Sequence, residues 1–268
     1  MLTVVLLILT IIALLWILSS MGILNQKSVA LEHLIQSKNK SADIYITKHV
    51  YDIIHRVARE ANIPEEKFAD RLPAVYVAET TAYQNVENQI FLKEEDVSDD
   101  PKIGEEVGHY LRSMCNPEGD TVKTSEFFGG LGRLVMGAKK IRLSNEEVSQ
   151  YHEVEKYENL IKQKIANLEQ EALELLGRPS HEISKEEFAR LPEDTRDRVR
   201  KLDQELGALG VEWGGCIGAK KTIRGHEQGY IAAEHAYQQN ALKKDPDLFL
   251  KPRNEAEKIV DSYLTEKE

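Results

Sequence analysis

The sequence predicts an α+β protein that is mostly helical and begins with a transmembrane helix. Three observations lead to that prediction. The N-terminus is a long uncharged run, two short segments near residues 74–78 and 88–92 are apolar and β-prone, and apolar residues recur at helical spacing through most of the remainder. Charged residues make up 30% of the 268, so most of the chain is expected to fold in water.

Net charge and cysteine content exclude several classes of protein. The formal net charge is −10, whereas binding to nucleic acid requires a basic surface that releases counterions. We therefore expect no nucleic-acid partner. The only cysteines are Cys115 and Cys216, which excludes a disulfide-stapled scaffold and a zinc module built from CxxC pairs.

The N-terminal run predicts a membrane anchor. Residues Leu2 to Leu24 carry no charge, and as a helix they would span about 34 Å against a bilayer core of about 30 Å. No basic residue precedes the run and no small-x-small cleavage site follows it, which favours an uncleaved anchor over a signal peptide. The first lysines, among them Lys27 and Lys38, follow the run. The positive-inside rule then predicts a single-pass protein of the cell membrane with its body in the cytoplasm. We assign 1–26 to the anchor and 27–43 to a juxtamembrane linker.

The next part of the chain, 44–143, is expected to form a small core. A helix is predicted over 44–61 and ends at Asn62-Ile63-Pro64, followed by the two strands, the second expected at a sheet edge. Asp99-Asp100-Pro101 predicts the start of a helix that runs to about Met114. Residues 125–136 predict a glycine-rich helix, with a loop as the alternative. Each of its glycines costs about 1 kcal/mol of helix stability, which a close approach to another element would offset.

The C-terminal half predicts long helices. Apolar residues recur every seven positions in 144–176, and a second helix is expected over 193–209. We interpret 144–209 as an antiparallel helical hairpin inserted into the core. The glycine-rich segment around Cys216 is expected to be a turn with a buried cysteine. Helices over 222–242 and 255–264 then complete a C-terminal region, 210–268, that packs on the core.

One predicted helix carries a metal-binding pattern. In the sequence IGEEVGHYL, Glu105 and His109 stand four residues apart and share one helix face. The pattern is that of H-E-x-x-H, in which two ligands hold zinc and the intervening glutamate activates water. Glutamate replaces the first histidine here, so Glu105 and His109 are the candidate ligands and Glu106 is the candidate catalytic base. The Glu106-x-x-His109 pair also occurs in di-iron helical bundles, but the sequence contains no second Glu-x-x-His.

Residues 44–136 resemble the core of gluzincin-type, zincin-like metallopeptidases. The resemblance consists of the order of elements, helix, strand, strand and motif helix, together with E-E-x-x-H in place of H-E-x-x-H. It implies an acidic third ligand from a downstream helix. Glu126, in SEFFGGLG, is the first candidate, and Glu227, in GHEQGYIAAEH, is the second. His226 and Tyr230 would then support the site from outside the ligand set, or act as an alternative ligand.

The expected cofactor is one divalent metal ion. Zinc is the ion of the family, and carboxylate is an accepted zinc ligand. A carboxylate-rich site also suits manganese or iron. On charge alone, Glu105→His is expected to tighten zinc binding.

The sequence thus predicts a membrane-anchored metallohydrolase, a peptidase that uses metal-activated water on a protein or peptide substrate. The alternative is a catalytically inactive, zincin-like scaffold protein at the membrane, in which the hairpin binds a partner.

Overall fold

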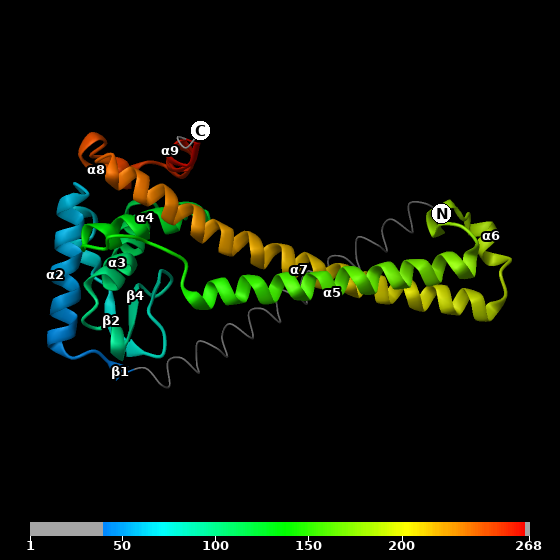
Figure 1. Cartoon of the computed structure of the whole chain (residues 1–268). Coiled ribbons are helices and arrows are strands. Elements are labelled where there is room, and N and C mark those ends of the chain that lie inside the picture. Colours follow the sequence, from blue (N-terminus) through cyan, green and yellow to red (C-terminus); the bar gives the residue numbers. More distant parts are fainter. Residues whose placement is uncertain (1–39, 266–268) are drawn as a thin grey trace.

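The computed structural model describes residues 40–265, and it shows a mixed core from which a long helical hairpin projects (Figure 1). The protein is mostly helical with one small sheet, which confirms the predicted α+β class. The predicted anchor lies outside the described residues, as does nearly all of the predicted linker. Within 40–265, no helix has both the length and the apolar character that crossing a membrane requires.

The sheet has four strands in the order β1-β2-β4-β3. These are β1 (Lys40–Ser41), β2 (Ala74–Ala78), β3 (Ala82–Gln84) and β4 (Gln89–Lys93). The two predicted strands, β2 and β4, pair in parallel, while β1 and β3 add antiparallel edges. The expectation that the strand through Ile90 lies at an edge is therefore wrong. β3 covers that side of β4, and its three residues are too few to show a period-two pattern.

Two capped helices lie next to the sheet. Helix α2 (Ile44–Glu60) begins at Asp43, whose carboxylate accepts the backbone N–H groups of Tyr45 and Ile46. Helix α3 (Asp100–Cys115) begins at Asp99, whose side chain accepts the N–H of Lys102, with a proline in the first turn. The predicted start of the motif helix is confirmed to within two residues. The 3-10 turns Glu65–Lys67, Ala69–Arg71 and Glu94–Asp96 connect these elements.

Helix α4 (Val122–Val135) crosses α3 at van der Waals contact of the two backbones. A Cβ atom added to Gly132 would lie 2.1 Å from the carbonyl oxygen of Gly104, and one added to Gly108 would lie 2.4 Å from that of Phe128. The glycine-rich segment is thus a helix and not a loop. The close approach to α3 offsets the helix propensity that its glycines lose.

The hairpin consists of α5 (Asn145–Leu176) and the distal half of α7 (Glu193–Gln238), joined by a 3-10 turn at Ser180–Glu182 and by α6 (Lys185–Ala189). The two long helices run antiparallel (Figure 1). Near the tip Arg198 pairs with Glu171, and nearer the core the indole N–H of Trp213 donates to Glu158. The buried Glu158 carboxylate also pairs with Lys162 and Lys220, so the interface holds a polar cluster that fixes the pairing of the helices.

Helix α7 is continuous over 46 residues, so the turn predicted around Cys216 and the two separate helices predicted on either side of it are wrong. Cys216 is buried, as expected. Nothing lies within 4 Å of a Cβ atom added to Gly214 or Gly215, so these glycines face away from α5. Packing along α5 outweighs the loss of about 1 kcal/mol per glycine, and the helix passes through. One rigid element therefore connects the hairpin tip to the core.

The C-terminal segment packs on the core through α8 (Ala241–Lys244), a 3-10 turn at Leu248–Leu250, and α9 (Arg253–Thr265). The buried guanidinium of Arg112 ties this segment to α3. It forms a bidentate pair with Asp120, with bonds of 2.7 and 3.0 Å, and donates to the carbonyl oxygens of Phe249 and Lys251. Helices α3, α8 and α9 and the 3-10 turn all contribute residues to a single hydrophobic core.

Another buried acid, Asp96, lies at the end of the sheet. Its carboxylate accepts hydrogen bonds from Thr81 Oγ1 at 2.6 Å and from Lys102 Nζ at 2.5 Å. Burial alone would raise the pKa of Asp96, but these two donors outweigh it and hold the pKa below its usual range.

Candidate metal centre

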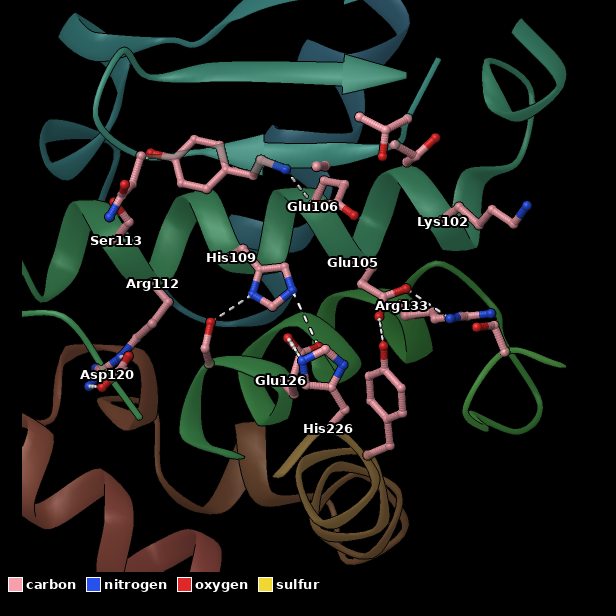
Figure 2. A pocket seen from close by; sticks show the side chains of 18 of the residues that line it. Lys102, Glu105, Glu106, His109, Arg112, Ser113, Asp120, Glu126, Arg133 and His226 are labelled. Atoms are coloured by element: carbon pink, nitrogen blue, oxygen red, sulfur yellow. Dashed lines mark hydrogen bonds and ion pairs between the residues drawn. The ribbon is translucent and has the colours of Figure 1, made fainter. Parts of the chain in front are cut away.

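A cleft of about 760 Å³ runs beside α3, with β3 along one wall and α4 and the core end of α7 along the other. Six of the predicted site residues line it: Glu105, Glu106, His109, Glu126, His226 and Tyr230. Figure 2 shows Glu105 and His109 on the α3 face that looks toward α4 and α7, and Glu106 on the face toward the sheet.

Three of these side chains form a group that could hold a metal ion. Each of Glu105, His109 and Glu126 offers one ligand atom, and the three atoms lie within 4.8 Å of one another. His109 Nε2 is 3.7 Å from Glu126 Oε2. Ligands bonded to zinc at about 2.1 Å stand roughly 3.4 Å apart in a tetrahedral site, so movements of about 1 Å would close this group on one ion.

Glycines bring the three groups together. Gly129 of α4 lies against the imidazole of His109, where an added Cβ would stand 2.5 Å from Nε2. On the other side, Gly229 of α7 lies against Glu126, where an added Cβ would stand 2.6 Å from Glu126 Cβ. No side chain separates the helices at either point, so α3, α4 and α7 converge on the group.

The ring of His109 is oriented from behind. Its Nδ1 forms a hydrogen bond of 3.1 Å with Ser125 Oγ, which leaves Nε2 facing Glu126. Such a bond on the second ring nitrogen is what fixes histidine ligands in metal sites. Burial alone would lower the pKa of His109, but the carboxylates of Glu126, Glu106 and Glu105 outweigh it and raise the pKa above its ordinary value.

Glu106 has the environment of a general base. Its Oε2 accepts the backbone N–H of Tyr83, on β3, at 2.6 Å. Burial raises the pKa of Glu106 to about 7, with the charges of Glu105 and Glu126 adding to the rise and His109 opposing it. A carboxyl group whose pKa lies near neutrality can both accept and return a proton at physiological pH.

Both oxygens of Glu105 accept hydrogen bonds. Arg133 NH1 donates to Oε2 at 2.8 Å, and the hydroxyl of Tyr230 donates to Oε1 at 2.5 Å. Burial, together with the nearby carboxylates, raises the pKa of Tyr230, so it remains a neutral donor. Tyr230 thus contacts one member of the candidate ligand group directly.

The two candidates for a third ligand are placed differently. Glu126 lies in the group described above, whereas Glu227 is exposed and does not line the cleft. His226 does line it. Its Nδ1 bonds to Glu147 Oε1 at 2.7 Å, and its Nε2 lies 3.7 Å from Glu126 Oε1. Glu147 also closes the capping box of α5 by accepting the N–H of Ser144, so one carboxylate caps the hairpin helix and holds His226.

Three residues at the site were not predicted from the sequence: Ser125, Arg133 and Glu147. Arg133 follows Glu126 by two helical turns and therefore lies on the same face of α4, which is a signal that the sequence contains. Glu147 follows Ser144 in the pattern of a capping box, but its bond to His226 joins positions 79 residues apart. No local pattern could have shown that contact.

Comparisons of the chain with protein-family models, with curated proteins and with solved structures find no match.

Proposed function

We propose that the protein is a membrane-anchored, zincin-like metallohydrolase that cleaves a protein or peptide substrate. The observation that supports the proposal is the convergence of Glu105, His109 and Glu126 from two helices, beside the half-buried carboxyl group of Glu106.

The donor set suits a divalent ion. One imidazole nitrogen and two carboxylates are accepted zinc ligands, and their oxygen-rich character also suits manganese or iron(II). A bound ion would act as a Lewis acid and lower the pKa of a coordinated water molecule. The residues present therefore fit the cofactor that the motif implies.

Glu106 would take the proton from the attacking water and return it to the leaving amine. Its carboxyl group opens onto the same cleft as the ligand group, and its raised pKa matches that task. The bond to the Tyr83 N–H would hold the carboxyl group at the wall formed by β3. Because this wall is the sheet edge, the base lies between the ligand group and the edge strand.

Two donors on α7 would stabilise negative charge that develops on the substrate carbonyl oxygen. The Tyr230 hydroxyl would be one of them, once its single O–H turns from Glu105 Oε1 toward the substrate. The other is the ring of His226, which Glu147 holds through Nδ1 with Nε2 on the side of Glu126. The cleft volume, about 760 Å³, lies in the range of substrate-binding clefts. The uncharged N-terminal run would keep this body at the cytoplasmic face of the membrane.

A second candidate function is that of a scaffold protein without catalytic activity. The hairpin projects from the core and exposes apolar side chains such as Val211 and Ile217, which suits a partner-binding arm (Figure 1). In that case the Glu105–Arg133 pair would persist and no ion would be held.

The test uses Glu106→Gln and the matched control Glu227→Gln, which changes an exposed glutamate on α7. We expect Glu106→Gln to retain the metal and to lose cleavage of a mixed peptide library, because the amide is nearly isosteric but accepts no proton. The control should retain both. The measurements are metal per chain by elemental analysis and peptide products by mass spectrometry. Undiminished cleavage by Glu106→Gln would contradict the mechanism, and a wild-type protein without metal or cleavage would favour the scaffold.

A further inference from the structure

Glu105 adds a negative charge where the H-E-x-x-H pattern has a neutral histidine, and Arg133 supplies a positive charge beside it. The guanidinium NH1 donates to Glu105 Oε2 at 2.8 Å. Within residues 40–265, Arg133 is the only arginine or lysine in an ion pair with a member of the candidate ligand group. Counted with two carboxylates, a neutral imidazole and one guanidinium, the four side chains of Glu105, His109, Glu126 and Arg133 carry a formal net charge of −1. Two neutral histidines and one glutamate carry the same charge.

The contact between Arg133 and Glu105 differs from that of a structural ion pair in the same protein. Arg112 meets Asp120 through two parallel bonds and also satisfies two backbone carbonyls, with a guanidinium that is almost fully buried. Arg133 meets Glu105 through one bond and lines the cleft. Its Nε is buried without a hydrogen-bond partner in the described part of the chain. Arg133 therefore lacks the two parallel bonds that are typical of an arginine–carboxylate pair whose only role is to hold two helices together.

The position of the pair is fixed by a close backbone contact between α3 and α4. Gly104 precedes Glu105, Gly132 precedes Arg133, and these two glycines mark the point where α3 and α4 touch. Because Arg133 lies two turns beyond Glu126, the same face of α4 presents both the carboxylate and the guanidinium to the cleft. Charge and counter-charge are thus built into one helix crossing.

We propose that Arg133 is the charge-balancing residue of the metal centre, which sets the affinity for the divalent ion by neutralising Glu105. This inference rests on the metal centre of the proposed function, but not on peptide cleavage. It reverses the expectation drawn from the sequence for Glu105→His. That substitution alone leaves the Arg133 charge without a partner beside the ion, so it should weaken zinc binding instead of tightening it.

The decisive comparison is made in the Glu105→His background. If Arg133 balances charge, adding Arg133→Met removes an uncompensated cation near the ion and should tighten zinc binding by roughly tenfold. If Arg133 only ties α3 to α4, its bond is already lost in that background, and Arg133→Met should leave the zinc affinity unchanged.

The experiment measures zinc affinity of the full-length chain in detergent by competition with a chromogenic chelator, with circular dichroism to verify folding. Arg133→Lys, which keeps the charge, should not tighten zinc in the Glu105→His background. Arg142→Met is the matched control, because Arg142 lines the same cleft but pairs with Glu234. Arg133→Gln provides a second neutral variant in case Arg133→Met folds poorly.

The proposal is supported if Glu105→His binds zinc more weakly than the Glu105→His, Arg133→Met double variant, while the lysine and Arg142 variants show no such gain. It is overturned if the double variant matches Glu105→His, or if Arg142→Met gives the same gain. A protein that binds zinc and shows the predicted gain but cleaves no peptide would support this inference and contradict the hydrolase.

Discussion

Gly132→Ala is expected to push α3 and α4 apart and to weaken binding of an ion at the proposed metal centre. The new methyl group would stand 2.1 Å from the carbonyl oxygen of Gly104, and real Cβ atoms essentially never approach a neighbour within 3.0 Å. The helices must therefore separate by about 0.9 Å at this point. The obstacle is backbone, so no side-chain rotation can relieve it.

The magnitude follows from two opposing effects. Overpacking of a well-packed contact costs about 3 kcal/mol at the upper end of its usual range, and the gain in helix propensity from glycine to alanine returns about 1 kcal/mol. The net loss of about 2 kcal/mol should lower the melting temperature by roughly 4–8 °C. A separation near 1 Å is also about half the length of a metal–ligand bond. Because it would move the ligand atoms of α3 and α4 apart, the group formed by Glu105, His109 and Glu126 should bind an ion more weakly.

The assay compares Gly132→Ala with Gly214→Ala by thermal unfolding and by zinc titration. Nothing lies within 4 Å of a Cβ added to Gly214, so the control should gain up to about 1 kcal/mol and bind zinc as the wild type does. A Gly132→Ala protein that is as stable as the wild type, with the same zinc affinity, would refute the reasoning that the glycine contact sets the site.

Two further predictions concern stability. Arg112→Met leaves the buried carboxylate of Asp120 without its ion-pair partner and should lower the free energy of unfolding in urea by about 3–5 kcal/mol. Arg200→Met, which removes an exposed ion pair, should change it by less than about 1 kcal/mol. Equal effects of the two substitutions would contradict a structural role for Arg112. The pKa of Asp96 is held below its usual range by Lys102 and by a hydroxyl donor, so its contribution is fully present above the unfolded-state pKa, near 4, and is lost as pH falls through the lower folded-state pKa. Asp96→Asn should therefore reduce the acid dependence of the unfolding free energy below pH 4, and an unchanged dependence would show that this carboxyl group is not its source.

Local signals in the sequence were enough to predict the motif helix and its ligand face. Asp99 and the following proline mark the start of α3, and the spacing of Glu105 and His109 places both on one side of it. Strands β2 and β4 were visible as short apolar runs, although only β4 is largely buried. These features depend on interactions within a few residues of one another.

The features that were missed depend on contacts between distant parts of the chain. The segment around Gly214 has low helix propensity, and only its packing on α5 keeps α7 continuous. The pairing of Arg133 with Glu105 and that of His226 with Glu147 depend on how the helices cross, which the glycine contacts determine. The spacing could suggest that Arg133 shares a helix face with Glu126, but it could not show which side chains of other helices that face contacts.

The most direct test of the account is an anomalous-diffraction measurement on crystals of the full-length wild-type protein purified without added metal. Data collected on both sides of the zinc, iron and manganese absorption edges would locate and identify a bound ion. We predict one anomalous peak within about 2.2 Å of a carboxylate oxygen of Glu105, of His109 Nε2 and of a carboxylate oxygen of Glu126. A cleft without a peak, in which Glu105 keeps its bonds to Arg133 and Tyr230, would contradict the metal centre.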